Sequence, residues 1–185
     1  LYSYSRLEEN MYSFHVELIS ANSVNFMASA EKLAALGSLC ELCNDCLPEK
    51  ENTERFYNVI DKFFKQINED NWRTYYSYFE FYLLDYLGIG LDLSRCAVTG
   101  QRSNLRYVSP KSGKAVSAEA GAPYQNRLFA YPEYIIKHNE HPSLKEISDT
   151  LKMTEFFLNK NFFQLHGLKF PENRVNLRDN LIKHL

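Results

Sequence analysis

The stretch that decides the fold covers residues 79–124 and reads FEFYLLDYLGIGLDLSRCAVTGQRSNLRYVSPKSGKAVSAEAGAPY. It has the frame of a zinc ribbon, a small unit in which two Cys-x-x-Cys turns bind one Zn²⁺. At these turns the chain has Cys96-x-x-Thr99 and Ser117-x-x-Ala120, so only one of the four thiolates is present. Hydroxyl and methyl groups do not replace thiolate ligands, and we therefore predict a degenerate, zinc-ribbon-like β-hairpin that binds no metal.

Composition indicates a folded globular chain. The sequence has 185 residues, 45% of them hydrophobic, which is enough to bury a core of its own. No apolar run approaches the roughly 18 residues that span a bilayer, and the first residues do not form a signal sequence. We therefore expect a cytoplasmic protein with no membrane partner. Because the chain begins at Leu1 rather than at Met, we also expect a fragment of a longer protein.

The charge is unevenly distributed, although the net charge is only -2. Residues 1–94 carry 7 Lys and Arg against 15 Asp and Glu, a net charge of -8, whereas residues 95–137 carry 7 against 2, a net charge of +5. Basic side chains with aromatic neighbours (here Tyr107 and Tyr124) can hold the phosphates and stack the bases of single strands. The alternative is an ordinary solvated surface. The candidate DNA-binding residues are Arg95, Arg102, Arg106, Lys111, Lys114 and Arg127.

An ordered set of short motifs resembles the C-terminal region of the RecO family of bacterial DNA repair proteins. Each motif is weak alone, and the order makes the set specific. Members with and without the four cysteines are known, and this chain resembles the metal-free ones. The matching residues are Leu47-Pro48-Glu49, Trp72, Phe79-Glu80-Phe81, Leu83-Leu84, Gly88, Cys96, Ser109-Pro110, Gly113 and Phe170-Pro171-x-x-Arg174.

The resemblance implies a mainly α fold. Residues 21–185 would form the RecO-like helical bundle, with residues 94–124 as the ribbon-like insertion that lacks zinc ligands. Residues 1–20 would be the last strands of a truncated N-terminal OB fold. The implied function is that of a recombination mediator, which is not an enzyme and needs no cofactor. It would bind single-stranded DNA and single-strand-binding protein, promote strand annealing, load the recombinase together with RecR, and associate with the nucleoid during repair.

The same resemblance implies a pocket for the acidic, Phe-ending C-terminal tail of single-strand-binding protein. Such a tail requires an apolar pocket with basic side chains at its rim. Basic residues on the predicted aromatic helices supply the candidates, which are Arg55, Lys62 and Arg73, with Lys65 nearby. Sequence alone does not select among them, and solvated charges over an aromatic core are an equal alternative.

Periodicity predicts the elements. Alternation between Tyr2 and Leu18 indicates one β-hairpin with a turn at residues 8–10. Helical spacing then predicts a series of helices. For the first, we expect an apolar face formed by Phe26, Ala30, Leu33, Leu36, Cys40, Cys43 and Leu47. Further helices are expected over residues 53–67, 72–87 and 156–167, and others begin at Pro132 and at Pro171. The capping box Ser143-x-x-Glu146 predicts the start of one more helix, with Leu144, Ile147 and Leu151 on its inner face.

A different class of function is a metal- or cluster-binding regulatory module. It would use Cys40, Cys43 and Cys46, which form a Cys-x-x-Cys-x-x-Cys run, together with Cys96. On a helix, however, positions 40 and 46 point in directions roughly 240° apart, so the three thiols do not converge. A purely structural interaction domain is a third possibility. Catalytic motifs are missing, and the five histidines are dispersed along the chain.

Overall fold

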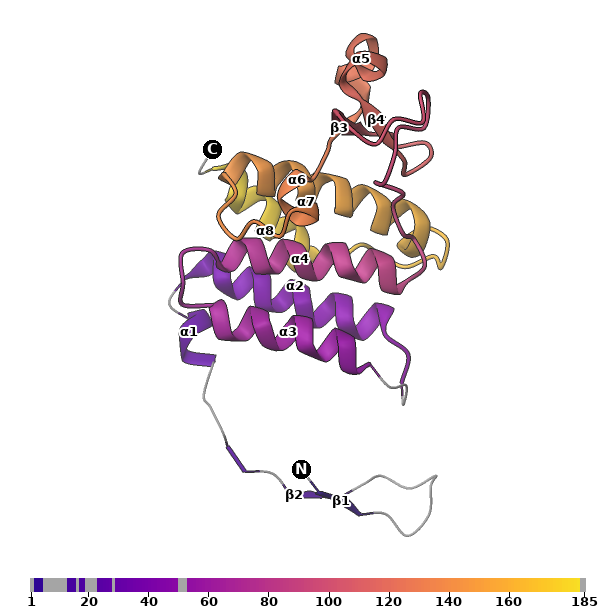
Figure 1. Cartoon of the computed structure of the whole chain (residues 1–185). Coiled ribbons are helices and arrows are strands. Elements are labelled where there is room, and N and C mark those ends of the chain that lie inside the picture. Colours follow the sequence, from indigo (N-terminus) through magenta and orange to yellow (C-terminus); the bar gives the residue numbers. More distant parts are fainter. Residues whose placement is uncertain are drawn as a thin grey trace.

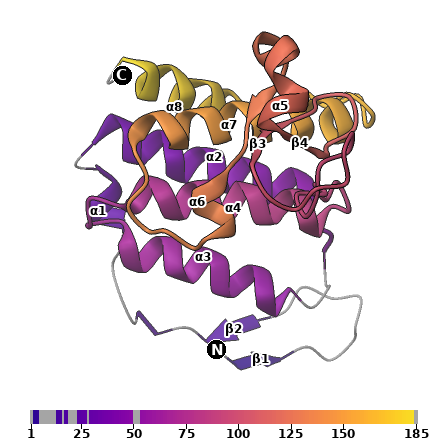
Figure 2. The same cartoon turned by 45° about the horizontal axis from the view of Figure 1, so that its top comes forward.

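The computed structural model describes residues 2–4, 13–15, 17–18, 23–27, 29–49 and 53–183. Its body is a bundle of helices from which a small β unit projects (Figures 1 and 2). The longer helices of the bundle are α2 (Ala30–Cys46), α3 (Glu54–Gln66), α4 (Trp72–Tyr86), α7 (Leu144–Leu158) and α8 (Glu172–Ile182). Two short helices, α1 (Ser23–Met27) and α6 (Glu133–Ile136), complete it. The prediction of a mainly α fold is confirmed.

The projecting unit is a three-stranded antiparallel sheet in the order β4-β3-β5. It consists of β3 (Leu105–Val108), β4 (Ala115–Ser117) and β5 (Phe129–Ala130). A short helix, α5 (Ala118–Gly121), and a 3₁₀ turn, η1 (Ala122–Arg127), connect β4 to β5. The predicted hairpin is present, but β5 has only two residues and no alternation that could have predicted it.

At the N-terminal end, β1 (Tyr2–Tyr4) pairs antiparallel with β2 (Ser13–His15), and Ser3 lies opposite Phe14. The predicted pairing of these two segments is confirmed. The turn expected at residues 8–10 lies outside the described residues.

The predicted apolar face of the first helix is correct only in part, because Phe26 is buried and Leu36, Cys43 and Leu47 pack against the core whereas Ala30, Leu33 and Cys40 are exposed. Ser29 caps α2, with its side chain accepting a hydrogen bond from the backbone N–H of Lys32, and separates it from α1. Leu33 is 53% exposed and Cys40 is exposed as well. Ala, Leu and Cys occur on all sides of this helix, so spacing alone did not select a face. The residues that α2 buries are Glu31, Ala34, Ala35, Ser38, Leu39, Leu42 and Cys46.

Helices α3 and α4 agree with the prediction. Phe56 and Phe63 of α3 are buried against Tyr76 and Phe79 of α4, with ring centroids 5.6–5.8 Å apart for the pairs Phe56–Phe79 and Phe63–Tyr76. Helix α4 stops before Gly88, whose φ of +70° is a backbone conformation that other residues rarely adopt.

The capping box at the start of α7 is confirmed, because Ser143 and Glu146 bond reciprocally to each other's backbone N–H groups. Leu144, the first residue of α7, was expected inside but is 37% exposed. The helix expected over residues 156–167 is not separate. Helix α7 continues directly into a π turn, η2 (Asn159–Phe163).

A buried ion pair joins the helices. Arg174 of α8 and Glu80 of α4 are both fully buried and form two charge-assisted hydrogen bonds, one of them 3.1 Å long between Nη2 and Oε2. Tyr76 donates to Glu80 Oε1 at 2.8 Å, and Thr154 of α7 donates to Oε2 at 2.5 Å. The Tyr76 hydroxyl also lies 2.6 Å from Ser38 Oγ of α2. One carboxylate therefore organises polar contacts from four helices.

We expect Arg174→Met to lower the free energy of unfolding by about 3–5 kcal/mol, because it leaves Glu80 charged, buried and uncompensated. The double variant Glu80→Gln, Arg174→Met removes both charges and should be more stable than the single variant. Urea unfolding of the three proteins measures this. Arg178→Ala is the control, since it removes a partly exposed arginine worth at most about 1 kcal/mol. A double variant no more stable than the single one would contradict the prediction.

Candidate partner groove and nucleic-acid interface

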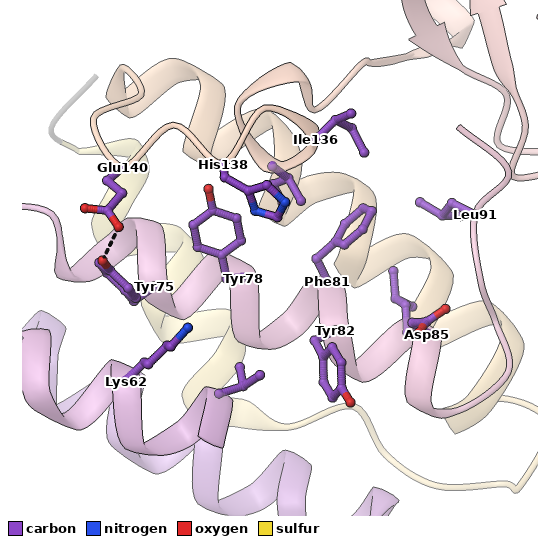
Figure 3. A pocket seen from close by; sticks show the side chains of 13 residues that line it. Lys62, Tyr75, Tyr78, Phe81, Tyr82, Asp85, Leu91, Ile136, His138 and Glu140 are labelled. Carbon is purple, nitrogen blue, oxygen red and sulfur yellow. Dashed lines mark hydrogen bonds between the residues drawn. The ribbon is translucent and has the colours of Figure 1, made fainter. Parts of the chain in front are cut away.

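An open groove of about 600 Å³ lies between α3, α4 and the segment around α6 (Figure 3). Most of its lining is aromatic or aliphatic, which suits an apolar side chain of a partner. The residues that line it are Val59, Lys62, Tyr75, Tyr78, Phe81, Tyr82, Leu84, Asp85, Leu91, Ile135, Ile136, His138 and Glu140.

Tyrosines of α4 form one wall of the groove. Tyr75, Tyr78 and Tyr82 follow at spacings of three and four, which places them on one face of the helix. The Tyr75 hydroxyl donates to Glu140 at 2.8 Å, and the Tyr78 hydroxyl donates to the carbonyl of Tyr134 at 3.2 Å. Burial, followed by the carboxylate of Glu140, raises the pKa of Tyr75 to about 12, so it remains a neutral donor. The sequence analysis missed this wall because aromatic residues occur on several faces of α4.

The groove also contains charged groups. Lys62 extends from α3 toward the tyrosines, whereas Asp85 and Glu140 lie at opposite ends of the α4 wall (Figure 3). Tyr75 already engages Glu140, so Lys62 and Asp85 are the charges most available to a ligand.

The structure separates the three residues that the sequence suggested for the partner tail. Arg55 and Lys62 lie seven residues apart on α3, so they share the face that carries Val59 into the groove. Arg73, by contrast, bonds to Glu31 of α2, with Nε 2.7 Å from Oε1, and its guanidinium lies 4.8 Å from the centre of the Trp72 ring. Lys65 pairs with Asp61 at 2.6 Å.

All six candidate DNA-binding residues are exposed on or beside the β unit. Arg102 and Arg106 line a second hollow of about 280 Å³ next to α6, together with Lys137, which the sequence analysis had not selected. Arg95 and Lys114 lie close enough to Asp92 to help lower its pKa, after the larger effect of its hydrogen bonds from Ser94. The remaining two are Lys111, in the β3–β4 turn, and Arg127, at the end of η1.

The two tyrosines of the β unit differ. Tyr107 packs against Gly121 so closely that a Cβ at residue 121 would lie 2.3 Å from its ring. Tyr107 therefore anchors the hairpin. Tyr124 is 59% exposed and free to contact a base.

The ribbon-like turns do meet in space. Cys96 is 2% exposed, and its Sγ accepts hydrogen bonds from the backbone N–H groups of Ser117 at 3.2 Å and Thr99 at 3.5 Å. The thiol lies 3.5 Å from Ser117 Oγ, which becomes the donor when the sulfur is ionised. Burial by itself raises the pKa of a thiol, but here the hydrogen bonds from Ser117 and Thr99 outweigh it and lower the pKa of Cys96 to about 6.

Comparison with known proteins identifies the family. The family model described as "Recombination protein O C terminal" matches residues 27–158. The DNA repair protein RecO of Wolbachia sp. subsp. Drosophila simulans is 36% identical over 177 residues, which cover 92% of this chain and 74% of that protein. The chain belongs to the RecO family.

Other RecO proteins match similarly. Those of Rickettsia canadensis and Rhodospirillum rubrum are each 34% identical, over 92% and 96% of this chain and 70% and 73% of their own lengths. No solved structure gives a significant match. The chain is thus a member of a family of DNA repair and recombination proteins, as its motifs indicated. Among the described residues, no helix is long and apolar enough to span a membrane.

The structure does not favour the metal-binding alternative for this RecO-family chain. On α2, Cys40 is exposed, Cys43 is half-buried and Cys46 is buried, so the thiols face in different directions. Burial raises the pKa of Cys43 and Cys46 to about 12, which opposes the thiolate form that a metal needs. Within the part of the chain that the structure describes, no three His, Cys, Asp or Glu side chains are grouped as metal ligands.

The lowered pKa of Cys96 predicts a pH dependence of stability. Its folded pKa of about 6 lies below the ordinary thiol value of 9.0, so the folded state holds fewer protons between these values. The stabilisation is complete above pH 9 and is lost as the pH falls through 6. Stability should therefore rise from pH 6 to pH 9 more steeply in the native chain than in Cys96→Ser, as measured by urea unfolding. Parallel pH profiles of the two proteins would contradict this.

Proposed function

We propose that this chain acts in DNA repair and homologous recombination as a mediator that binds single-strand-binding protein and single-stranded DNA. The observation that supports this most directly is that an apolar groove, suited to a peptide, and a basic hollow, suited to DNA, lie next to each other. An aromatic groove lies on one side of α6, and a hollow lined by Arg102 and Arg106 lies on the other. With RecR, the protein would promote strand annealing and recombinase loading in the cytoplasm, at the nucleoid.

In this proposal the protein holds its ligands and makes or breaks no covalent bond. Three groups with shifted pKa values have structural surroundings: Arg174 and Tyr76 lie in the buried network, and Cys96 is buried beside Ser117 of β4. No cofactor is needed for such a role. Residues 94–124 would be a ribbon that has lost its zinc ligands, and residues 1–20 would be the end of an OB fold.

The groove is the proposed site for the tail of single-strand-binding protein. The terminal Phe would insert beside Tyr78 and Tyr82, where aromatic rings prefer tilted contacts. Its carboxylate would meet Lys62, and acidic residues upstream would follow the same face of α3 toward Arg55. Asp85 and Glu140 lie on the α4 side, so repulsion by these carboxylates favours this path along α3. Arg73 would contribute only if the tail displaced Glu31 from it.

We expect Lys62→Ala to weaken binding of a fluorescent acidic peptide that ends in Phe by about tenfold, because a charge-assisted hydrogen bond to the carboxylate is lost. Fluorescence anisotropy measures the affinity. Lys65→Ala is the matched control, since Lys65 lies on the same helix but outside the groove and pairs with Asp61. A peptide without its Phe should not bind. If the two lysine variants bind the peptide with equal affinity, the tail does not bind in this groove.

The exposed cations of the hairpin are the proposed contacts for single-stranded DNA. Each phosphate that a protein neutralises on a single strand contributes roughly 0.7 to the slope of log affinity against log salt. We expect the double variant Lys111→Ala, Lys114→Ala to reduce that slope by up to about 1.4. Lys145→Ala, which breaks an exposed pair with Asp149 on α7, should leave the slope unchanged. An unchanged slope in the double variant would exclude these lysines as DNA contacts.

A further inference from the structure

The hollow beside α6 has the character of an anion site. Its lining consists of Arg102, Asn104, Leu105, Arg106, Tyr131, Glu133, Ile136 and Lys137. Three of these side chains are cationic and one is acidic. The volume of about 280 Å³ lies just below the roughly 300–1,000 Å³ of pockets that enclose a whole small molecule. It suits one charged group of a larger ligand.

The acidic side chain of the hollow already forms an ion pair. Glu133 Oε1 lies 2.5 Å from Nζ of Lys137, the residue that follows α6. The hydrogen bond and charge of Lys137, with a smaller effect of Arg106, lower the pKa of Glu133, so the pair stays ionised. Within the described chain, by contrast, neither Arg102 nor Arg106 forms an ion pair. Both arginines therefore line this hollow without an ion-pair partner of their own among the described residues.

Backbone hydrogen bonds hold the segment that carries the two arginines. Arg106 lies in β3, the central strand of the sheet, and its carbonyl accepts from the N–H of Tyr131 at 3.0 Å. Asn104, between the two arginines, has a φ of +56°, and its carbonyl accepts from the N–H of Ala118 at 2.9 Å. Arg102 precedes β3 and Arg106 lies within it, and both line the same hollow.

We propose that this hollow binds one internal phosphodiester of single-stranded DNA, held jointly by Arg102 and Arg106. Planar guanidinium groups match two phosphate oxygens at once, which an ammonium group does not. This proposal rests on the proposed function, and it distinguishes these two arginines from the lysines of the β3–β4 turn, which contact the strand only as separate charges.

The test compares Arg106→Lys and Arg102→Lys with the native chain in binding to a labelled single-stranded oligonucleotide. Both variants keep the charge but lose the bidentate geometry, so each should lose about tenfold in affinity. Arg178→Lys is the matched control, because Arg178 is a partly exposed arginine on α8 and lies outside the hollow. If the lysine variants bind like the native chain, the proposal is wrong although DNA binding itself remains. If the folded native chain does not bind the oligonucleotide at all, the proposed DNA function fails, and this inference with it.

Two further measurements identify the ligand. If Arg102 and Arg106 hold the same phosphate, Arg102→Ala and Arg106→Ala combined should cost less than the product of the single effects. Effects that multiply would assign the arginines to separate phosphates and overturn the proposal. Oligonucleotides with a 5′-hydroxyl or a 5′-phosphate should bind equally. If the arginine variants lose affinity only for the 5′-phosphorylated oligonucleotide, the ligand is a terminal phosphate and the proposal is wrong.

Discussion

The buried pair of Arg174 and Glu80 constrains the rest of the structure. Two charges without access to water are tolerated only when their hydrogen bonds are met. Here Tyr76 of α4 and Thr154 of α7 donate to Glu80, and Arg174 donates to the Leu151 carbonyl of α7. Ser38 of α2 in turn contacts the Tyr76 hydroxyl. The negative charge of Glu80 keeps the pKa of Arg174 above its ordinary value despite the opposing effect of burial. The same pair orients α4. Tyr78 and Tyr82 each lie two residues from Glu80, about 200° around the helix. Once Glu80 faces the inside of the bundle, these tyrosines face the groove.

Aromatic packing and hydrogen bonds hold the β unit in place. Phe129 of β5 lies with its ring centroid 5.2 Å from that of Phe156 and 5.9 Å from that of Phe157, which fixes the sheet to α7. The Tyr131 hydroxyl donates to the carbonyl of Leu93 at 3.0 Å and closes the base of the unit. Cys96 accepts hydrogen bonds from the backbone N–H groups of Thr99 and Ser117. These contacts together anchor the β unit.

Sequence predicted those features that a local signal encodes. The capping box of α7 and the helices expected over residues 53–67 and 72–87 depend on residues a few positions apart. Sequence-based prediction failed where the deciding contact joins residues far apart in the chain, or where similar residues occur on all faces of a helix. Glu80 and Arg174 both belong to family motifs, yet they are 94 residues apart and no periodicity relates them. Arg73 was a candidate for the partner pocket because α4 is aromatic on several faces, and only the position of Glu31 shows that it faces α2. Sequence suggested Arg102 and Arg106 as DNA contacts but not Lys137, which only the fold brings beside them.

The short helix α6 separates the two candidate ligand sites, because Ile136 lines both the groove and the hollow. A single helical turn between two sites could act either as a hinge or as a fixed wall. The ring of Tyr134 is buried, and its hydroxyl donates to Ser77 Oγ at 2.7 Å, while Tyr78 holds the carbonyl of Tyr134 from the other side. Tyr75 fixes the following loop through Glu140. Three tyrosine hydroxyl contacts thus tie α6 and the loop after it to α4, and they hold the wall that the groove and the hollow share.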